Sequence, residues 1–238
     1  MLRRHALKQG RSLFLLLLIG AADLIILGVL VLQMAVGIET VAGTEGSAVE
    51  PKYVALTFDD GPSREYTKLL LDGLRERDVQ ASFFLLGICI PGNEDLVEQM
   101  ERDGHLIGVH GMKHRDLTKE KPKDAVMQIR ETAEMIAGIT GKEPEYLRPP
   151  FGNWNEKLGA AVEKELAMVP VFWDVDSLDW KVQDSGKIVK KVLEDVENGD
   201  ILLFHDTFDS SVEAVLQLID KLKAKGYTFL TADELMVD

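Results

Sequence analysis

The sequence contains only one cysteine. No disulfide can therefore form within the chain. Cys89 lies in the apolar run from 83 to 90, where we expect a small buried thiol without a chemical role. The sequence also lacks internal repeats, and it has no low-complexity tract beyond an apolar run near its N-terminus.

Basic residues are in deficit, since 27 Lys and Arg residues stand against 40 Asp and Glu residues and give a formal net charge of −13. A protein that binds duplex nucleic acid needs a basic footprint. The short run Lys221–Lys225 has the pattern of a solvated helix end rather than of such a footprint. We therefore expect no nucleic-acid partner.

Long apolar runs are absent except over residues 13–38, where Asp23 is the only charged residue. Seventeen of these residues are Leu, Ile, Val or Phe. At about 0.3–0.6 kcal/mol each, they outweigh the cost of roughly 3 kcal/mol for placing Asp23 in a membrane. We expect an uncleaved membrane anchor, and the alternative is a signal peptide processed at Gly20–Ala22.

The anchor sets the expected organisation of the chain. The bases before it are Arg3, Arg4, Lys8 and Arg11, and by the positive-inside rule they leave the N-terminus in the cytoplasm. We expect a cytoplasmic basic segment over 1–12, a transmembrane anchor over 13–38, a flexible linker over 39–50 and one domain over 51–238. This domain would lie outside the cytoplasm and be held at the membrane by a single transmembrane segment. It would be secreted if that segment is instead a cleaved signal peptide.

Apolar runs alternate with amphipathic runs after residue 50, which favours parallel strands joined by helices. The expected strands are Tyr53–Phe58, Ala81–Leu86, Leu106–Val109, Glu145–Arg148, Val169–Trp173, Ile201–Phe204 and Tyr227–Leu230. The intervals between them carry apolar residues at three- and four-residue spacing, as helices do. Polar residues directly follow several of the strands. In a β/α barrel they would converge at the C-terminal ends of the strands.

Two adjacent acids and a His-x3-His pair predict a metal site. Asp59 and Asp60 follow the first expected strand, and His110 and His114 follow the third. Two imidazoles and one carboxylate suit Zn²⁺ or another late first-row divalent ion, and three protein ligands leave positions for water and substrate. The acid of the pair that does not bind the metal is then free to act as a base. The alternative is that the two acids only cap a helix beginning near residue 63. His105 is expected to border a turn and a strand, and is left out of the site.

Five strings of residues, taken in order, resemble the polysaccharide deacetylase family with its NodB homology domain, carbohydrate esterase family 4. They are Thr57–Pro62, His110–His114, Arg148–Gly152, Asp176–Trp180 and Leu203–His205. The resemblance covers about residues 50 to 238. It implies an α/β fold, a distorted (β/α)7 barrel, and metal-dependent hydrolysis of acetyl groups from carbohydrate.

The resemblance also implies roles for single residues. Asp60, His110 and His114 would bind the metal, and Asp59 would be the catalytic base. Arg148 would hold Asp59 in its charged form and orient it. His205 would be the general acid, and Asp179 would raise the pKa of His205 and fix its tautomer. The implied substrate-binding residues are Pro150, Phe151, Gly152, Trp180 and Leu203.

The expected function is therefore a metal-dependent hydrolase that removes N-acetyl groups from a cell-wall or chitin-like polysaccharide, with N-acetylglucosamine or N-acetylmuramic acid units of peptidoglycan as the expected target. An O-acetyl esterase on xylan or another glycan is the nearest alternative, and a non-catalytic wall-binding protein is another. Zn²⁺ is the expected metal, with Co²⁺, Ni²⁺ and Mn²⁺ as alternatives. Val109, Gly111 and Met112 depart from residues frequent in the family, which bears on metal preference.

Overall fold

A computed structural model of the protein describes residues 50–236. The expected cytoplasmic segment, the expected anchor over 13–38 and residues 39–49 of the expected linker lie outside the described residues. Within 50–236, no helix is both long and apolar enough to cross a membrane. The described residues from 51 onward belong to one compact unit.

Eight strands form one sheet, and every strand pair in it is parallel. They are β1 (Lys52–Asp59), β2 (Ser82–Leu85), β3 (Leu106–Val109), β4 (Tyr146–Leu147), β5 (Val169–Pro170), β6 (Val175–Asp176), β7 (Asp200–His205) and β8 (Tyr227–Leu230). The order along the sheet is β5-β4-β3-β2-β1-β7-β6, and β8 pairs with β1. This is the parallel, curled half-barrel of an α/β protein.

The long strand β1 lies at the centre of the sheet. It pairs with β7 along Val54–Asp59, with β8 through Lys52–Ala55 and with β2 through Thr57–Asp59. All its residues from 54 to 59 are buried. Burial on both faces is the reason why such a strand reads as a nearly continuous apolar run.

The sheet is open, because β5 and β6 do not pair with each other among the described strands. The single strand expected over Val169–Trp173 is wrong in extent: only Val169–Pro170 is strand, and a separate short strand follows at Val175–Asp176. The backbone between them is engaged elsewhere. The carbonyl oxygens of Val171 and Phe172 accept hydrogen bonds from the guanidinium of Arg148 rather than from a neighbouring strand.

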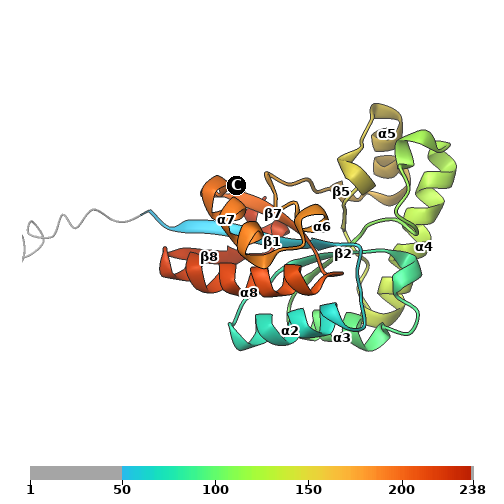
Figure 1. The fold of residues 1–238 in the computed structure, drawn as a ribbon. Helices are drawn as coiled ribbons and strands as arrows, with labels where there is room; N and C mark the ends of the chain where they lie inside the picture. Colours follow the sequence, from blue (N-terminus) through green and yellow to red (C-terminus); the bar gives the residue numbers. More distant parts are fainter. Residues whose placement is uncertain (1–49, 237–238) are drawn as a thin grey trace, which may run out of the picture. The chain divides into compact units, whose positions relative to one another are not determined.

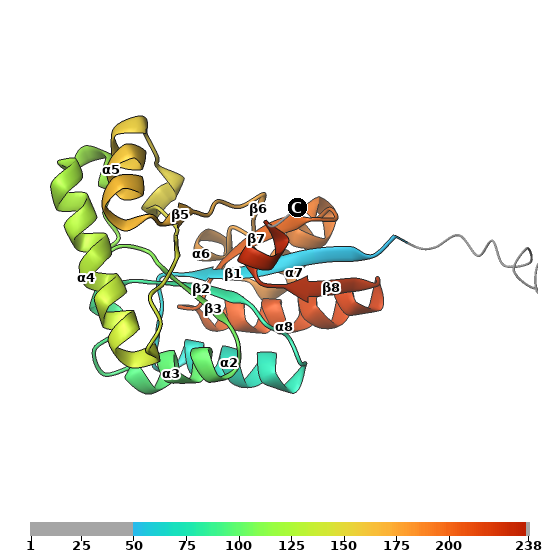
Figure 2. The same ribbon diagram turned by 180° about the vertical axis from the view of Figure 1, so that it is seen from behind.

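Helices cover the outside of the curled sheet, and neighbours along the arc α7-α8-α2-α3-α4-α5 pack against one another (Figures 1 and 2). The α-helices are α2 (Tyr66–Glu76), α3 (Glu94–Arg102), α4 (Pro122–Thr140), α5 (Glu156–Leu166), α6 (Asp179–Val182), α7 (Ser185–Asp195), α8 (Asp209–Ala224) and α9 (Ala232–Leu235). Three short 3-10 helices are η1 (Gly87–Cys89), η2 (Leu117–Lys119) and η3 (Pro150–Gly152). Cys89, expected to be buried, is partly exposed at the end of η1.

The expected amphipathic spacing puts the apolar face of each long helix into one core. In α8, Val215, Leu218, Ile219 and Leu222 are fully buried against the sheet layer. Each such side chain stabilises the fold by about 1.5–3 kcal/mol relative to an exposed one. The core therefore fixes the strands, and with them the loops that follow their C-terminal ends.

Candidate metal centre and active site

The residues expected from the sequence lie at the C-terminal ends of neighbouring strands. Asp59 ends β1, where it pairs in register with Phe84 of β2 and with His205 at the end of β7. His110 directly follows β3, and Arg148 follows β4. The parallel register thus brings residues up to about 150 positions apart in the sequence to one edge of the sheet.

Asp60, His110 and His114 form a cluster of potential metal ligands, with one ligand atom of each within 4.8 Å of the other two. The Oδ1 atom of Asp60 is 3.6 Å from Nε2 of His110 and 3.8 Å from Nε2 of His114. The two histidines lie in a loop rather than on a helix, and Gly111 in that loop has a φ of 84°. The helix-cap alternative for the two acids is wrong, because α2 begins only at Tyr66 and its N-cap is Glu65.

The donor set fits a divalent metal. Oδ1 of Asp60 is buried without a hydrogen-bond partner among the described residues. Nδ1 of His110 lies 2.7 Å from the carbonyl oxygen of Arg148, which can only accept, so Nδ1 carries the proton and the lone pair of Nε2 faces the carboxylates. This second contact is what metal-binding histidines commonly make. Burial lowers the pKa of His114, despite the charge of Asp60, and favours the neutral imidazole that binds metals.

Asp59 is held by a completely buried arginine. Nη1 of Arg148 donates to Oδ1 of Asp59 at 3.0 Å and to Oγ1 of Thr57 at 2.6 Å. Its Nε and Nη2 donate to the carbonyl oxygens of Val171 and Phe172. Oδ2 of Asp59 lies 3.7 Å from Nε2 of His110. One carboxylate oxygen is thus fixed by the arginine, and the other lies beside the metal-ligand cluster.

His205 is held by Asp179 on another side of the same site. Nδ1 of His205 lies 2.7 Å from Oδ1 of Asp179, while its backbone N-H and the hydroxyl of Ser211 both donate to Oδ2. Burial opposes the charged imidazolium, but the hydrogen bond and charge of Asp179, with the charges of Asp59 and Asp60, raise the pKa of His205 to about 9. His205 is therefore protonated near neutral pH and can donate a proton from Nε2.

A cavity of about 390 Å³ joins the cluster, the base and the acid. Its lining residues are Asp59, Asp60, His110, His114, Phe151, Trp173, Asp176, Trp180, Leu203 and His205. Of the expected substrate-binding residues, Phe151, Trp180 and Leu203 line it, whereas Pro150 and Gly152 do not. Phe151 and Trp180 are about half exposed, at 60% and 50%, so the mouth of the cavity is aromatic.

Four residues of the site were not predicted from the sequence, and one of them is Asp176, which lines the cavity. Ser211 supports Asp179 from the first turn of α8, Thr57 accepts from Arg148, and Trp173 lines the cavity. Thr57 lies inside the string Thr57–Pro62, and Trp173 lies just before the string Asp176–Trp180. Their positions in the sequence could therefore have indicated that they belong to the site. Ser211 follows Asp179 by 32 residues, and the sequence around Ser211 does not indicate that the two are in contact.

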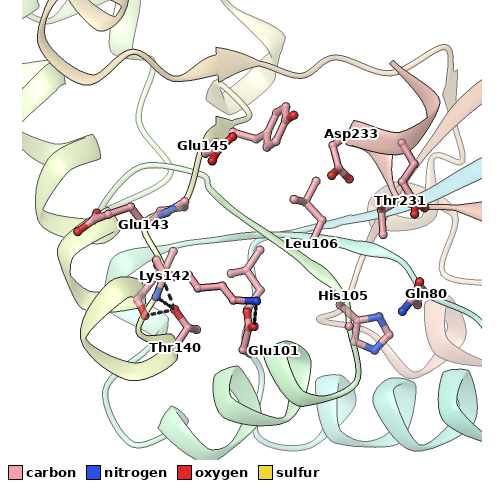
Figure 3. Close-up of a pocket in the computed structure, with 16 residues that line it drawn as sticks. Gln80, Glu101, His105, Leu106, Thr140, Lys142, Glu143, Glu145, Thr231 and Asp233 are labelled. Atoms are coloured by element: carbon pink, nitrogen blue, oxygen red, sulfur yellow. Dashed lines mark hydrogen bonds and ion pairs between the residues drawn. The ribbon is translucent and has the colours of Figure 1, made fainter. Parts of the chain in front are cut away.

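A second cavity, of about 450 Å³, is lined by residues that precede β2, β3 and β4 and by residues that follow β8 (Figure 3). His105 belongs to its wall, and the whole of β3 separates His105 from His110. Nδ1 of His105 accepts the backbone N-H of Ala81, and burial lowers the pKa of His105 to about 4. His105 is a neutral structural histidine at a strand start, as expected from the sequence, and takes no part in the metal-ligand cluster.

An open parallel half-barrel that carries an Asp-His-His cluster, an Arg-held aspartate and an Asp-held histidine around one cavity has the features of a metal-dependent hydrolase. The sequence model described as polysaccharide deacetylase matches residues 46–170 of this chain. The chain belongs to the polysaccharide deacetylase family, carbohydrate esterase family 4, with its NodB homology domain.

Two curated relatives are deacetylases of peptidoglycan. The peptidoglycan-N-acetylglucosamine deacetylase PgdA of Listeria monocytogenes is 38% identical over 184 residues, covering 77% of this chain and 39% of the relative. The peptidoglycan-N-acetylmuramic acid deacetylase PdaC of Bacillus subtilis is 34% identical over 199 residues, covering 83% and 42%. This chain spans about two fifths of the length of both relatives.

Solved structures agree with this relation. The structure of PdaC from Bacillus subtilis matches with a TM-score of 0.74 at 34% identity, covering 78% of this chain and 90% of that chain. A structure from Bacillus anthracis, described as a CE4 family pseudoenzyme, matches with a TM-score of 0.73 at 27% identity, covering 78% and 66%. The family therefore contains a chain without enzymatic function, and the site residues have to carry the argument for activity.

Proposed function

We propose that this protein is a metal-dependent N-deacetylase of a polysaccharide, with N-acetylglucosamine or N-acetylmuramic acid units of peptidoglycan as its substrate. One observation carries the proposal: Asp59, fixed by Arg148, and His205, fixed by Asp179, both line the cavity that also holds the Asp60, His110 and His114 cluster. The base, the acid and the ligand set that the reaction needs are all present. A non-catalytic wall-binding role is disfavoured because none of them is replaced.

The metal ligands would be Oδ1 of Asp60 and Nε2 of His110 and His114. A bound divalent ion would supply Lewis acidity toward the acetyl carbonyl and lower the pKa of water. We propose Zn²⁺, because two imidazoles and one carboxylate suit it.

The protein residues account for the proton transfers. Asp59 accepts a proton from the water that attacks the acetyl carbonyl, through the carboxylate oxygen that Arg148 leaves free. The C-N bond then breaks, and His205 donates its Nε2 proton to the departing amine nitrogen, so that acetate and a free amino sugar are released. Trp180, Leu203 and Phe151 bound the space beside these groups and would receive the acetyl methyl and the sugar.

We also propose that residues 13–38 anchor the protein in the membrane and that the domain acts outside the cytoplasm. An extracytoplasmic domain would have direct access to wall glycan. The support is the length and apolarity of that run and the bases before it.

The test is acetate release by the full-length chain, stripped of metal and then resupplied with Zn²⁺ or Co²⁺. The substrates are N-acetylglucosamine oligomers, peptidoglycan and an O-acetylated xylan, and the control is Asp59→Asn. We expect metal-dependent release from the amide substrates and a loss of 10²-fold or more in the variant. Release from the xylan alone would indicate an O-acetyl esterase, and no release from any substrate by the metal-loaded chain would indicate a binding role.

A further inference from the structure

Asp206 is a buried acid beside the site to which the proposed mechanism gives no role. It directly follows His205 at the end of β7, and only 1% of its surface is exposed. Its Oδ1 atom has no hydrogen-bond partner among the described residues. Buried polar atoms without partners are rare in folded proteins, so each needs a structural or functional explanation.

The carboxyl group of Asp206 lies directly against Gly61, the residue after the metal ligand Asp60. A Cβ atom at position 61 would lie 2.7 Å from Cγ of Asp206 and still nearer to both its carboxylate oxygens. The carboxyl group therefore occupies the space that any side chain at position 61 would need. On another side of the same residue, the carbonyl oxygen of Gly61 accepts the N-H of Leu86 at 3.0 Å.

Asp206 is also tied to the chain that leaves this turn. The backbone N-H of Ser63 donates to Oγ1 of Thr67 at 2.6 Å, and the Thr67 hydroxyl donates in turn to Oδ2 of Asp206. Thr67 is completely buried at the start of α2. The turn between β1 and α2 is thus connected to the end of β7 both by packing and by this relay.

The backbone of this turn has an uncommon conformation. Asp60 has a φ of 73°, in the left-handed region that residues other than glycine rarely adopt. Such a conformation persists only where the surrounding structure holds it in place, and it is common at functional sites. In this protein the constraint acts on the next residue, Gly61, against which the carboxyl group of Asp206 packs.

We infer that Asp206 is a positioning residue for Asp60: it packs against Gly61 and binds Thr67, and so holds the turn in the conformation that places Oδ1 of Asp60 between His110 and His114. The inference rests on the proposed metal site. An apolar side chain could fill the space but could not accept the hydrogen bond of Thr67, which explains why a polar residue is buried here.

The experiment measures Zn²⁺ affinity by calorimetry and by competition with a chelator, on the full-length chain in detergent. Asp206→Ala removes both the packing and the acceptor, and we expect its Zn²⁺ affinity to fall by about 10–100-fold, the range usual for residues that orient metal ligands. Thr67→Val removes only the relay and should lose less. Asp206→Asn keeps the shape and an acceptor, and should stay nearer to the unmodified chain than Asp206→Ala does.

Leu222→Ala is the matched control for lost stability, because Leu222 is fully buried near the C-terminal end of α8, about three helical turns after Ser211. It should lower the unfolding temperature without changing Zn²⁺ affinity. Unchanged affinity in folded Asp206→Ala, or an equal loss in Leu222→Ala, would overturn the inference. A lack of Zn²⁺ binding by the unmodified chain would instead overturn the proposed metal site, and the two failures are therefore distinguishable.

A double substitution tests the contact itself. Gly61→Ala alone places a Cβ against the Asp206 carboxyl group and should weaken Zn²⁺ binding. In Gly61→Ala combined with Asp206→Ala the overlap is removed, so affinity should recover relative to Gly61→Ala. If the double variant binds no better than the single one, Asp206 does not constrain position 61.

Discussion

His205 and Asp179 show at the scale of single residues how the fold sets a charge state. The Asp179 carboxylate accepts from His205 and from Ser211, and the complete burial of Asp179 prevents water from replacing these bonds. The raised pKa of His205 means that the native state holds a proton that the unfolded chain releases near pH 6.5. The pair is therefore both a proposed catalytic feature and a source of pH-dependent stability.

The first prediction concerns that pH dependence in metal-free protein. Because the folded pKa of about 9 exceeds the unfolded value of 6.5, the stabilisation is complete below pH 6.5 and is lost as the pH rises through 9. The free energy of unfolding should fall by an amount on the order of 3 kcal/mol across this window. Urea unfolding between pH 6 and 9.5 measures it, with the His205 imidazole titration followed by NMR.

Asp179→Asn removes the charge that raises the pKa of His205, so the decline between pH 6.5 and 9 should flatten. His105→Asn is the matched control, since burial lowers the folded pKa of His105 from 6.5 to about 4, and its contribution to pH-dependent stability therefore lies below about pH 6.5. An equally steep decline in Asp179→Asn and in the unmodified chain would contradict the assignment.

Residue identity was predictable from the sequence where chemistry restricts the choice of side chain. Asp60, His110 and His114 were expected together because few residue types bind a divalent ion, and the structure brings one potential ligand atom of each within 4.8 Å of the others. Ser211 and Asp206 were not predictable, because a serine or an aspartate after a strand has many ordinary uses. Their roles depend on contacts with Asp179 and Thr67, which only the folded chain provides.

At the scale of elements, buried strands were the most predictable parts of the fold. Leu106–Val109 and Tyr227–Leu230 have the expected bounds, and β1 extends the expected strand by one residue at each end. The segment after β5 was not predictable, because the carbonyl oxygens of Val171 and Phe172 accept from the side chain of Arg148 instead of from a neighbouring strand. This long-range contact shortened the expected strand to Val169–Pro170, and the separate strand Val175–Asp176 was not expected.

The 3-10 helix η3 supports the second prediction. Gly152 has a φ of 68°, and a Cβ there would lie 2.9 Å from the ring of Trp173, which lines the cavity. Gly152→Ala should therefore destabilise the fold by about 1–3 kcal/mol and displace Trp173. Denaturant unfolding measures the first effect, and the quenching of tryptophan fluorescence by a soluble quencher measures the second.

Gly138→Ala provides the comparison for this prediction. Gly138 lies within α4, and a Cβ there would meet no atom within 4 Å. Alanine should stabilise this helix by about 0.5–1 kcal/mol. If the two substitutions shift stability in the same direction, the strain assigned to position 152 is wrong.

At the scale of the whole molecule, the third prediction concerns the N-terminal apolar run. If residues 13–38 anchor the protein, the full chain should remain in the membrane fraction after washing with high salt or carbonate, and detergent should release it. A variant with Arg at positions 16 and 26 raises the insertion cost by about 5–7 kcal/mol and should fractionate with soluble proteins. Release of the unmodified chain by carbonate, or a mature N-terminus near residue 22, would favour a cleaved leader instead.

The fourth prediction couples the metal to the stability of the domain. A ligand that binds only the native state at 100 times its Kd stabilises that state by about 2.7 kcal/mol. In a domain of this size each kcal/mol raises the Tm by about 2–4 °C, so saturating Zn²⁺ should raise the Tm by roughly 5–10 °C. The shift should disappear in Asp60→Ala, which removes a proposed ligand, and persist in Asp59→Asn, which removes only the proposed base. If Asp60→Ala retains the full shift in Tm, the ion binds elsewhere. If Asp59→Asn loses the shift, Asp59 is a ligand rather than a free base, and the separate roles proposed for the two adjacent acids are wrong.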